Sequence, residues 1–480
     1  MIALVHPSTD ILLTTINAKW IHPSLALRLL KANLGALEDR CTILEFALRQ
    51  PLAEKLESIL AAAPRILGIS VSIWNHKATL ELLKALNAEW NDSKPVIVLG
   101  GPEVSYLPEE SEIFIFADWV IRGEGELAFR ELCVLLLEKN SNTVEKFIDV
   151  LPVDLAVIEN GYRLYAAEDL NRKLVYVEAG RGCPFGCEFC QSAIKRDTAA
   201  TRLPVVREFP LDRFLEEMER LIERGARGFK FLDRTFNLNI ERARTIMEFF
   251  LEKIITADRI SAEPPMYVHF EMIPARFPVE LREILKRFPA GSLRLEVGIQ
   301  TFNSNTAALI GRPSDPEKEL ETLHFLRRET NAIVHADLIA GLPGENMSSF
   351  GKGFDRLWQA RPTEIQLGIL KLLPGTPISR HTKTYGMVYA PDPPYEVLET
   401  AALPAVDLDR IKNFARFWEL IVNRGAFPDL VPALFPDGQP VFDRFMALSD
   451  MLLARFGRNW GIDRAELRSC LSAVNIQLSI

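Results

Sequence analysis

Two series of strand-like segments, each alternating with helical segments, dominate this chain of 480 residues. The first series runs to about residue 140 and includes ILGISVSI and PVIVLGG, and the second includes GFKFLD and LRLEVGI. Apolar strands separated by amphipathic helices indicate βαβ units and parallel sheets. Because a single core rarely grows beyond about 250 to 300 residues, we expect two or three domains. The predicted fold class is therefore α/β.

The first series predicts a doubly wound, flavodoxin-like parallel sheet over residues 1–140. Ligands of such sheets bind beyond the carboxyl ends of the strands, where glycine lets the backbone approach closely and serine offers a hydroxyl. The candidate binding residues at these predicted ends are Ser70, Ser72, Gly100, Gly101 and Glu124. The alternative is that they simply turn the chain. They form no G-x-G-x-x-G loop, so a nicotinamide nucleotide site has little support.

The second series predicts an open, partial (β/α)6 barrel over residues 173–390. Its strand-like runs are LVYVEAG, GFKFLD, MYVHFEM, LRLEVGI, IVHADLIA and IQLGILK. In such barrels the loops at the carboxyl ends of the strands carry the chemistry. Residues 141–172 break the pattern and are interpreted as a linker, whereas the amphipathic runs of residues 391–480 predict a C-terminal helical domain.

Three of the six cysteines fall within eight residues of the stretch VEAGRGCPFGCEFCQ, directly after a predicted strand. A structural zinc site usually takes four protein ligands in two separated pairs, and the sequence offers no second pair. An iron–sulfur cluster held by Cys183, Cys187 and Cys190 would instead leave one iron open to a small molecule. The other cysteines are scattered, as buried apolar side chains usually are, which argues against a disulfide framework. They are Cys41, Cys133 and Cys470.

The charge balance and the N-terminal stretch bear on partners and location. With 56 basic and 64 acidic side chains the net charge is −8, so no overall positive field recruits nucleic acid or anionic lipid. No apolar run approaches the ~20 residues that a bilayer requires, and MIALVHPSTDILL lacks the cationic start of a signal peptide. We therefore expect a cytoplasmic protein with neither a nucleic-acid nor a membrane partner.

The C-x3-C-x2-C spacing, with the aromatic Phe189 before its last cysteine, resembles the radical S-adenosylmethionine superfamily. FLDRTFN, EVGIQTFN, DLIAGLPGE and LKLLPGTPI resemble the successive strand-end motifs of its coproporphyrinogen-oxidase-like branch. The resemblance implies a [4Fe-4S] cluster on the three cysteines, with S-adenosylmethionine bound at the open iron. Reductive cleavage would then give a 5′-deoxyadenosyl radical, which abstracts hydrogen from unreactive carbon.

The same resemblance implies residues that hold S-adenosylmethionine. Glu271 and Arg312 would bind the amino and carboxylate groups of its methionine part, and Gln300 and Asp337 would bind the ribose hydroxyls; Phe189 is assigned to the same site. A zwitterion needs an acceptor and a donor of opposite charge, and a diol suits an amide or a carboxylate. The alternative for each residue alone is a surface ion pair or barrel packing.

Three N-terminal stretches resemble the cobalamin-binding radical enzymes: LGISVSIWNHKATLELLKAL, VLGGPEVSYLPEE and DWVIRGEGELAF. The resemblance covers about residues 1–390 and implies that the serines, glycines and Glu124 at the predicted strand ends contact cobalamin. No D-x-H-x-x-G motif occurs, because His6, His22 and His76 each lack an aspartate two positions earlier. A bound cobalamin is therefore expected to receive no histidine on its lower face.

These resemblances together imply a radical enzyme, expected to depend on cobalamin, that transfers a methyl group to an unactivated carbon. Rearrangement and cyclisation at such a carbon use the same cofactors and stay open. The alternatives are a cobalamin-independent radical enzyme with a relic N-terminal domain and a non-catalytic corrinoid or cluster sensor. A sensor would not need every group that holds S-adenosylmethionine. A methylthiotransferase is disfavoured, because only Cys41 and Cys133 are available for its second cluster.

The expected partners are a small-molecule or peptide substrate and an electron donor such as flavodoxin or ferredoxin. The C-terminal stretch resembles uncharacterised extensions of cobalamin radical proteins and implies no substrate. Its apolar positions Phe414, Phe417 and Trp418 are expected to form its core, although some could face the substrate opening.

Overall fold

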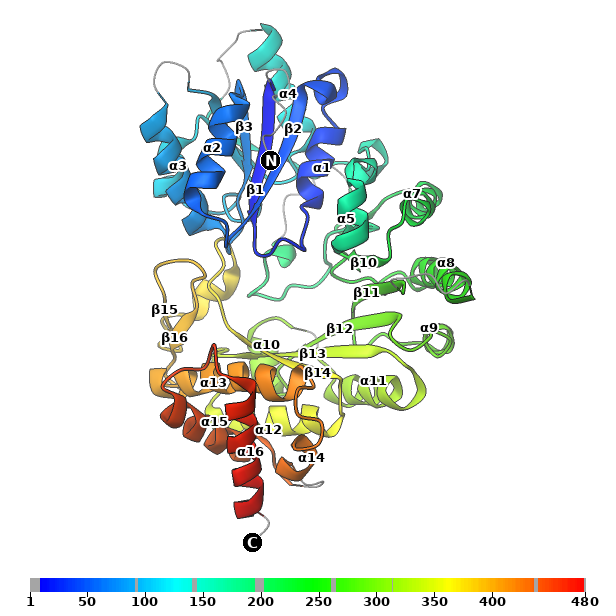
Figure 1. The fold of residues 1–480 in the computed structure, drawn as a ribbon, viewed down its shortest axis with the longest axis vertical. Coiled ribbons are helices and arrows are strands. Elements are labelled where there is room, and N and C mark those ends of the chain that lie inside the picture. The colour runs from blue at the N-terminus through cyan, green and yellow to red at the C-terminus, as the bar shows by residue number, and fades with distance from the viewer. Residues whose placement is uncertain are drawn as a thin grey trace. The chain divides into compact units, whose positions relative to one another are not determined.

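A computed structural model describes most of the chain (Figure 1). The described residues are 9–90, 94–139, 145–194, 203–259, 265–312, 314–435 and 439–478. The chain divides into two compact units, and each is described by itself. Unit 1 comprises Met1–Pro184, Gln191–Arg234 and Ser261–Val268, and unit 2 comprises Phe185–Cys190, Thr235–Ile260 and His269–Ile480.

Unit 1 contains the predicted doubly wound sheet, whose strand order is β2-β1-β3-β4-β5-β6 with parallel pairs throughout. Its strands are β1 (Ile11–Asn17), β2 (Cys41–Ala47), β3 (Ile66–Ser70), β4 (Val96–Gly100), β5 (Trp119–Arg122) and β6 (Phe147–Asp149). Its helices are α1 (Leu25–Ala32), α2 (Leu52–Ala62), α3 (His76–Glu89) and α4 (Glu126–Val134). The sixth strand, β6, lies in the stretch interpreted as a linker.

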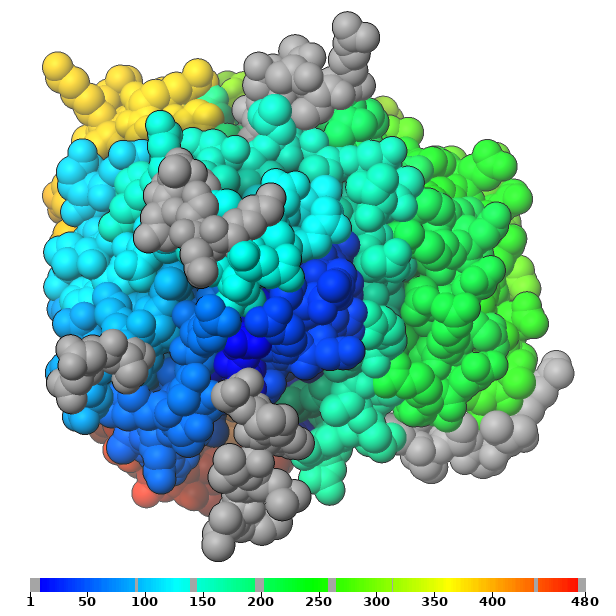
Figure 2. All heavy atoms as spheres, turned by 90° about the horizontal axis from the view of Figure 1, so that it is seen from above, coloured from blue at the N-terminus to red at the C-terminus, as the bar shows by residue number. Residues whose placement is uncertain are grey.

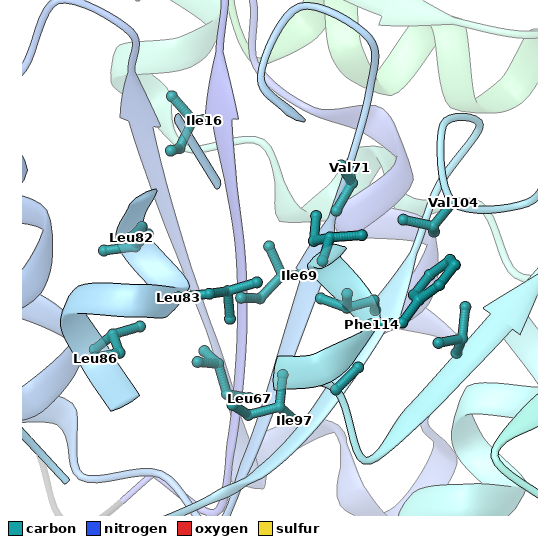
Figure 3. Close-up of a cluster of buried hydrophobic side chains, with 14 of the residues drawn as sticks. Ile16, Leu67, Ile69, Val71, Leu82, Leu83, Leu86, Ile97, Val104 and Phe114 are labelled. Atoms are coloured by element: carbon teal, nitrogen blue, oxygen red, sulfur yellow. The ribbon is translucent and has the colours of Figure 1, made fainter. Parts of the chain in front are cut away.

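Both faces of this sheet are buried, because alternate side chains of each strand enter different cores. Leu67 and Ile69 of β3 pack with Leu83 of α3 in the core of one face (Figure 3). Ile66 packs on the other face with Leu27 of α1 and with side chains of α4. Figure 1 shows α2 and α3 on one side of the strands and α1 on the other, and Figure 2 draws the surface of this domain in blue to cyan. This arrangement confirms the predicted doubly wound fold.

The second sheet has the order β14-β13-β12-β11-β10-β7, so that its first and last strands are not neighbours and the barrel is open, as predicted. Its strands are β7 (Val175–Val177), β10 (Gly228–Phe231), β11 (Tyr267–Met272), β12 (Leu293–Gln300), β13 (Ile333–Ala340) and β14 (Glu364–Ile369). The helices between them are α7 (Leu211–Glu223), α8 (Ile240–Arg259), α9 (Val279–Leu285), α10 (Ser304–Leu309), α11 (Pro316–Glu329) and α12 (Met347–Gln359). A short hairpin of β8 (Gly180–Arg181) and β9 (Arg207–Glu208) belongs to unit 1.

The C-terminal region of unit 2 is helical, as predicted. It contains α13 (Ala405–Trp418), the π-helix η8 (Glu419–Asn423), α14 (Val431–Leu434), α15 (Phe442–Phe456) and α16 (Arg464–Leu478), after a hairpin of β15 (Val388–Tyr389) and β16 (Val397–Glu399). Phe414, Phe417 and Trp418 are all buried, which confirms their predicted place in the core. Among the described residues, none of the helices is both long and apolar enough to cross a membrane.

Aromatic stacking joins these helices to the barrel helix α12. The Trp418 ring lies 4.8 Å from the ring of Phe354 and 4.9 Å from that of Phe445, in edge-to-face geometry in both cases. We predict that Trp418→Ala lowers the stability of unit 2 by about 3 to 5 kcal/mol, because it leaves a cavity at the centre of this cluster. Thermal or denaturant unfolding of the purified chain measures the loss.

The exposed Trp460, 63% accessible, supplies the control for this substitution. Trp460→Ala should change stability by less than about 0.5 kcal/mol, as surface substitutions usually do. Equal effects of the two substitutions would contradict the packing described.

Candidate functional site

The cysteine loop follows β7 and the short strand β8. Cys183 belongs to unit 1 and is half-buried, whereas Cys187 and Cys190 belong to unit 2, where the Cys190 N–H donates to the Cys187 carbonyl at 3.0 Å. All three thiols are free of disulfides. Burial raises the pKa of the Cys187 thiol, and the positive charge of Arg312 opposes this effect.

The donor set suits a cluster better than a single ion. In the described part of the chain, no three His, Cys, Asp or Glu side chains converge closely enough to hold one metal ion. An iron–sulfur cluster takes one thiolate on each of three irons, so its ligands do not have to meet at one point. Three free cysteines on one loop, with a guanidinium beside one of them, fit this requirement.

The carboxyl end of β12 carries Gln300 and binds Arg312, which follows α10 in the chain. Arg312 donates from Nε to the Ile299 carbonyl at 3.1 Å and from Nη2 to the Gly298 carbonyl, and its Nη1 lies 4.0 Å from the Cys187 sulfur. A bulge between Gly298 and Gln300 interrupts the pairing with β13, and Gln300 has a φ of 70°. Such bulges re-aim side chains next to active sites. A Cβ built on Gly298 would lie 2.5 Å from Gln300 Nε2 and 3.9 Å from Arg312 Nη2, so these two predicted ligands are neighbours, and Arg312 lies beside Cys187.

Glu271 and Asp337 lie on neighbouring parts of the same sheet. Asp337 pairs with Gly298 across β12 and β13, so that its side chain points to the face that also carries Gln366 of β14. Glu271 is the fifth residue of β11 and is half-buried, and its carbonyl accepts from the N–H of Phe236 at 3.2 Å. The assignments of Glu271, Gln300, Arg312, Asp337 and Phe189 to S-adenosylmethionine stay predictions.

A layer of histidines and carboxylates, not predicted from the sequence, lies two residues before Glu271 and Asp337. His269 Nε2 lies 3.4 Å from Glu296 Oε2, His335 Nε2 lies 3.6 Å from Glu364 Oε1, and the two imidazole rings are 5.6 Å apart. Strand register places Glu296, His335 and Glu364 side by side. The period-two spacing of polar residues in HFEM and HADL was the available signal.

The two glycines at the end of β4 differ in whether the fold could accommodate a side chain at their positions. Gly101 has a φ of 103°, and a Cβ there would lie 2.6 Å from the Val71 carbonyl oxygen, so the fold alone explains this glycine. A Cβ on Gly100 would meet nothing closer than 3.7 Å. Gly100 pairs with Ser70, the last residue of β3. Within the described part of the chain, no internal contact therefore requires Gly100 to be glycine.

The loop after β3 is fixed by Asn75, a residue that the sequence analysis missed. Asn75 is fully buried; its side-chain oxygen accepts from the Ser72 N–H at 2.8 Å and its Nδ2 donates to the Ile16 carbonyl at 3.0 Å. Next to it, the indole of Trp74 is 54% exposed. The predicted contact residue Ser72 is thus held in a rigid turn at the sheet edge.

Glu124 is part of a charge network within unit 1. Burial would raise its pKa, but hydrogen bonds and charge from Arg207 and Arg181 outweigh this effect and hold the pKa of Glu124 below its usual value. Arg207 Nη1 lies 2.8 Å from Glu124 Oε2, and Arg181 also binds Glu126 and Glu178, each at 2.6 Å. This network could not be predicted from the sequence, because its members are up to 83 residues apart.

Two of the three N-terminal histidines also have partners. His22 Nδ1 lies 2.9 Å from the Tyr176 hydroxyl, and His76 Nδ1 lies 2.8 Å from Glu103 Oε1. His6 lies outside the described residues. Whether any of them contacts cobalamin stays a matter of prediction.

Family models match three parts of the chain. Residues 177–357 match the radical SAM superfamily, residues 11–133 match the B12 binding domain, and residues 383–460 match a family described as a protein of unknown function, DUF4080. The chain is a B12-binding member of the radical SAM superfamily. The predicted family and its cofactors, an iron–sulfur cluster, S-adenosylmethionine and cobalamin, are confirmed at the level of these domains.

Curated relatives of this B12-binding radical SAM protein include two methyltransferases. It is 22% identical over 409 residues to the cobalamin-dependent radical SAM methyltransferase TokK of Streptomyces tokunonensis, covering 79% of this chain and 56% of TokK. It is 23% identical to the 2-(S-pantetheinyl)-carbapenam-3-carboxylate methyltransferase of Streptantibioticus cattleyicolor, covering 67% of this chain and 49% of that enzyme. The chain thus spans about half the length of these relatives.

Solved structures share the fold. OxsB, a cobalamin-dependent S-adenosylmethionine radical enzyme with aqua-cobalamin bound, superposes with a TM-score of 0.62 at 16% identity, covering 92% of this chain and 72% of OxsB. The radical S-adenosylmethionine methyltransferase TsrM of Kitasatospora setae superposes with a TM-score of 0.59 at 18% identity, covering 80% of this chain and 78% of TsrM.

A buried carboxyl group lies directly behind the Gln300 bulge. The Thr301 hydroxyl donates to Glu345 Oε1 at 2.7 Å, and the Ser349 hydroxyl donates to the same oxygen at 3.3 Å. Desolvation outweighs these hydrogen bonds and raises the pKa of Glu345 from 4.5 to about 7. The folded protein therefore keeps this group protonated over a range of pH in which the unfolded chain has lost the proton.

This difference predicts a pH-dependent loss of stability. The contribution of Glu345 is fully present below pH 4.5 and is lost as the pH rises towards 7, on the order of 3 kcal/mol in all. Glu345→Gln keeps an acceptor for Thr301 but cannot ionise. The variant should therefore gain stability relative to the wild type between pH 5 and pH 8, as measured by thermal unfolding across this range.

An exposed carboxylate serves as the control. Glu283 is 64% exposed, so Glu283→Gln should not change the pH profile in this range. Parallel stability profiles of the wild type and Glu345→Gln would show that Glu345 ionises normally.

Proposed function

We propose that this chain is a cobalamin-dependent radical S-adenosylmethionine enzyme that transfers a methyl group to an unactivated carbon. The observation that carries the proposal is the succession of a B12 binding domain and a radical SAM domain, in which Arg312 lies beside Cys187 and Gln300 lies near Arg312. Two curated relatives that are named methyltransferases favour methyl transfer over rearrangement or cyclisation. The substrate is proposed to be a small molecule or peptide, with a one-electron donor such as flavodoxin or ferredoxin.

The protein's own part is to bind, orient and exclude water. When bound, the cofactors supply one-electron reduction, hydrogen abstraction and a carrier for the methyl group. Cys183, Cys187 and Cys190 would hold the cluster. Arg312 is fixed by two backbone carbonyls, so its guanidinium is pre-oriented for a carboxylate without further loss of side-chain freedom.

The other predicted polar groups would complete the binding site for S-adenosylmethionine. Glu271 would accept from its amino group, and Gln300 and Asp337 would bind the ribose hydroxyls. Gln300 is held in a left-handed conformation, which a protein maintains only where its surroundings enforce it. The backbone at Gln300 would therefore be fixed before the cofactor arrives, which would lower the entropic cost of binding there.

The products of turnover distinguish the possible functions. Donation of the methyl group of S-adenosylmethionine leaves S-adenosylhomocysteine, whereas reductive cleavage leaves 5′-deoxyadenosine. Reconstituted protein given S-adenosylmethionine, hydroxocobalamin and a strong reductant should form both products, detected by chromatography and mass spectrometry. A variant in which Cys183, Cys187 and Cys190 are all alanine should form no 5′-deoxyadenosine.

Each other outcome selects another function. 5′-Deoxyadenosine alone would favour rearrangement or cyclisation, or a cobalamin-independent enzyme with a relic N-terminal domain. Neither product, from protein that carries both iron and corrinoid, would favour a non-catalytic sensor. Cleavage that survives in the triple alanine variant would show that the cluster lies elsewhere.

The corrinoid site is tested separately at Gly100. We predict that Gly100→Trp blocks uptake of hydroxocobalamin, because an indole would occupy the strand-end edge where a planar ligand would approach. The iron content should not change, because none of the three cysteines is altered. Absorbance after desalting measures the bound corrinoid, and iron analysis measures the cluster.

Glu57→Trp, an exposed position on α2, controls for the added indole. It should bind as much corrinoid as the wild type. Full corrinoid retention by Gly100→Trp would place the binding site elsewhere.

A further inference from the structure

A buried carboxylate lies inside the cysteine loop, between two of the three cysteines. Glu188 follows Cys187 directly, and its side chain is only 8% exposed. Charged side chains are almost never buried to this extent unless they are paired. The partners of Glu188 therefore show which parts of unit 2 hold this loop.

Both side-chain partners come from the 3-10 helix η7 (Pro377–His381). His381 Nε2 lies 2.9 Å from Glu188 Oε2, and its side chain is 10% exposed. The Arg380 guanidinium donates to the other carboxylate oxygen, Oε1. A separation of 192 residues or more lies between Glu188 and these partners, so the contact joins segments that are distant in sequence.

The main chain of Glu188 is held as firmly as its side chain. Its N–H donates to the Ile310 carbonyl at 2.9 Å, and its carbonyl accepts from the Ile378 N–H at 3.0 Å. Ile310 lies two residues before Arg312, whose guanidinium lies beside the Cys187 sulfur. One residue thus fastens the cysteine loop both to η7 and to the segment that carries Arg312.

We propose that Glu188 is a positioning residue for the iron–sulfur cluster, with Arg380 and His381 as its anchors. It holds the turn from Cys187 to Cys190 in place before the cluster is inserted, and it fixes a charge beside the two thiolates. The inference rests on the proposed function in one respect, that these cysteines hold the cluster. Mutation of a residue that supports a metal ligand typically lowers metal affinity by roughly ten- to a hundredfold.

The fixed charge gives the inference a signature that loop packing alone would not give. The reduction potential of a cluster depends on the net charge around it. Glu188→Gln removes a negative charge and should shift the potential to more positive values. Arg380→Gln removes a positive charge from the same contact and should shift it to more negative values. If Glu188 only packed the loop, the reduction potential would not shift in opposite directions in these two variants.

The test uses the full chain, reconstituted with iron and sulfide under anaerobic conditions. Iron and sulfide per chain, the rate of iron loss to a chelator, and the reduction potential from a titration followed by electron paramagnetic resonance are measured for each variant. Glu188→Ala should release iron roughly tenfold faster than the wild type and retain less after desalting. Glu283→Gln, an exposed carboxylate of unit 2, should match the wild type in every measurement.

Wild-type iron retention and release in Glu188→Ala would overturn the inference, as would potentials that shift in the same direction in Glu188→Gln and Arg380→Gln. If circular dichroism shows that the alanine variant does not fold, the glutamine variants carry the test, because both keep most of the side-chain volume. A wild-type chain that takes up no iron would overturn the proposed function, and this inference with it.

Discussion

The hydrogen-bonded register of the parallel strands β12 and β13 decides which polar side chains of the barrel can meet. Glu296 pairs with His335, and Gly298 pairs with Asp337 two residues further on, so polar groups stack in layers towards the carboxyl ends. A shift of one residue would turn all of them into the apolar core behind the sheet. The regular pairing ends at the bulge before Gln300, where the candidate site begins.

At this bulge, backbone carbonyls fix an arginine beside a thiol. The carbonyls of Gly298 and Ile299 accept the Arg312 hydrogen bonds. Buried carbonyls need donors, and a guanidinium held by neutral acceptors keeps its full positive charge for an incoming anion. The same charge opposes the effect of burial on the pKa of Cys187. One local break in a strand thus positions a positive charge both beside the cysteine and at the predicted carboxylate-binding position.

The sequence was sufficient for features that repeat along the chain. Period-two and helical patterns predicted both sheets, and the cysteine spacing predicted the loop at a strand end. Contacts between distant segments left no such trace. Glu188 and His381 are 193 residues apart, and nothing in CEFC or SRH indicates that they meet. Likewise, the left-handed conformation of Gln300 could not be predicted, because its side chain does not favour it.

The predicted cobalamin contacts differ in whether the fold already requires the residue at that position. Gly101 is needed for a left-handed turn against Val71, and the Glu124 carboxylate is engaged by Arg181 and Arg207. Drawing Glu124 towards a ligand would take a carboxylate partner from the buried Arg207 and one of three carboxylates from Arg181, which is unfavourable. Among the described residues, nothing requires glycine at position 100, since a Cβ there would make only ordinary van der Waals contacts. Because the fold does not require this glycine, a substitution at Gly100 tests the predicted cobalamin contact with less risk to folding than one at Gly101 or Glu124.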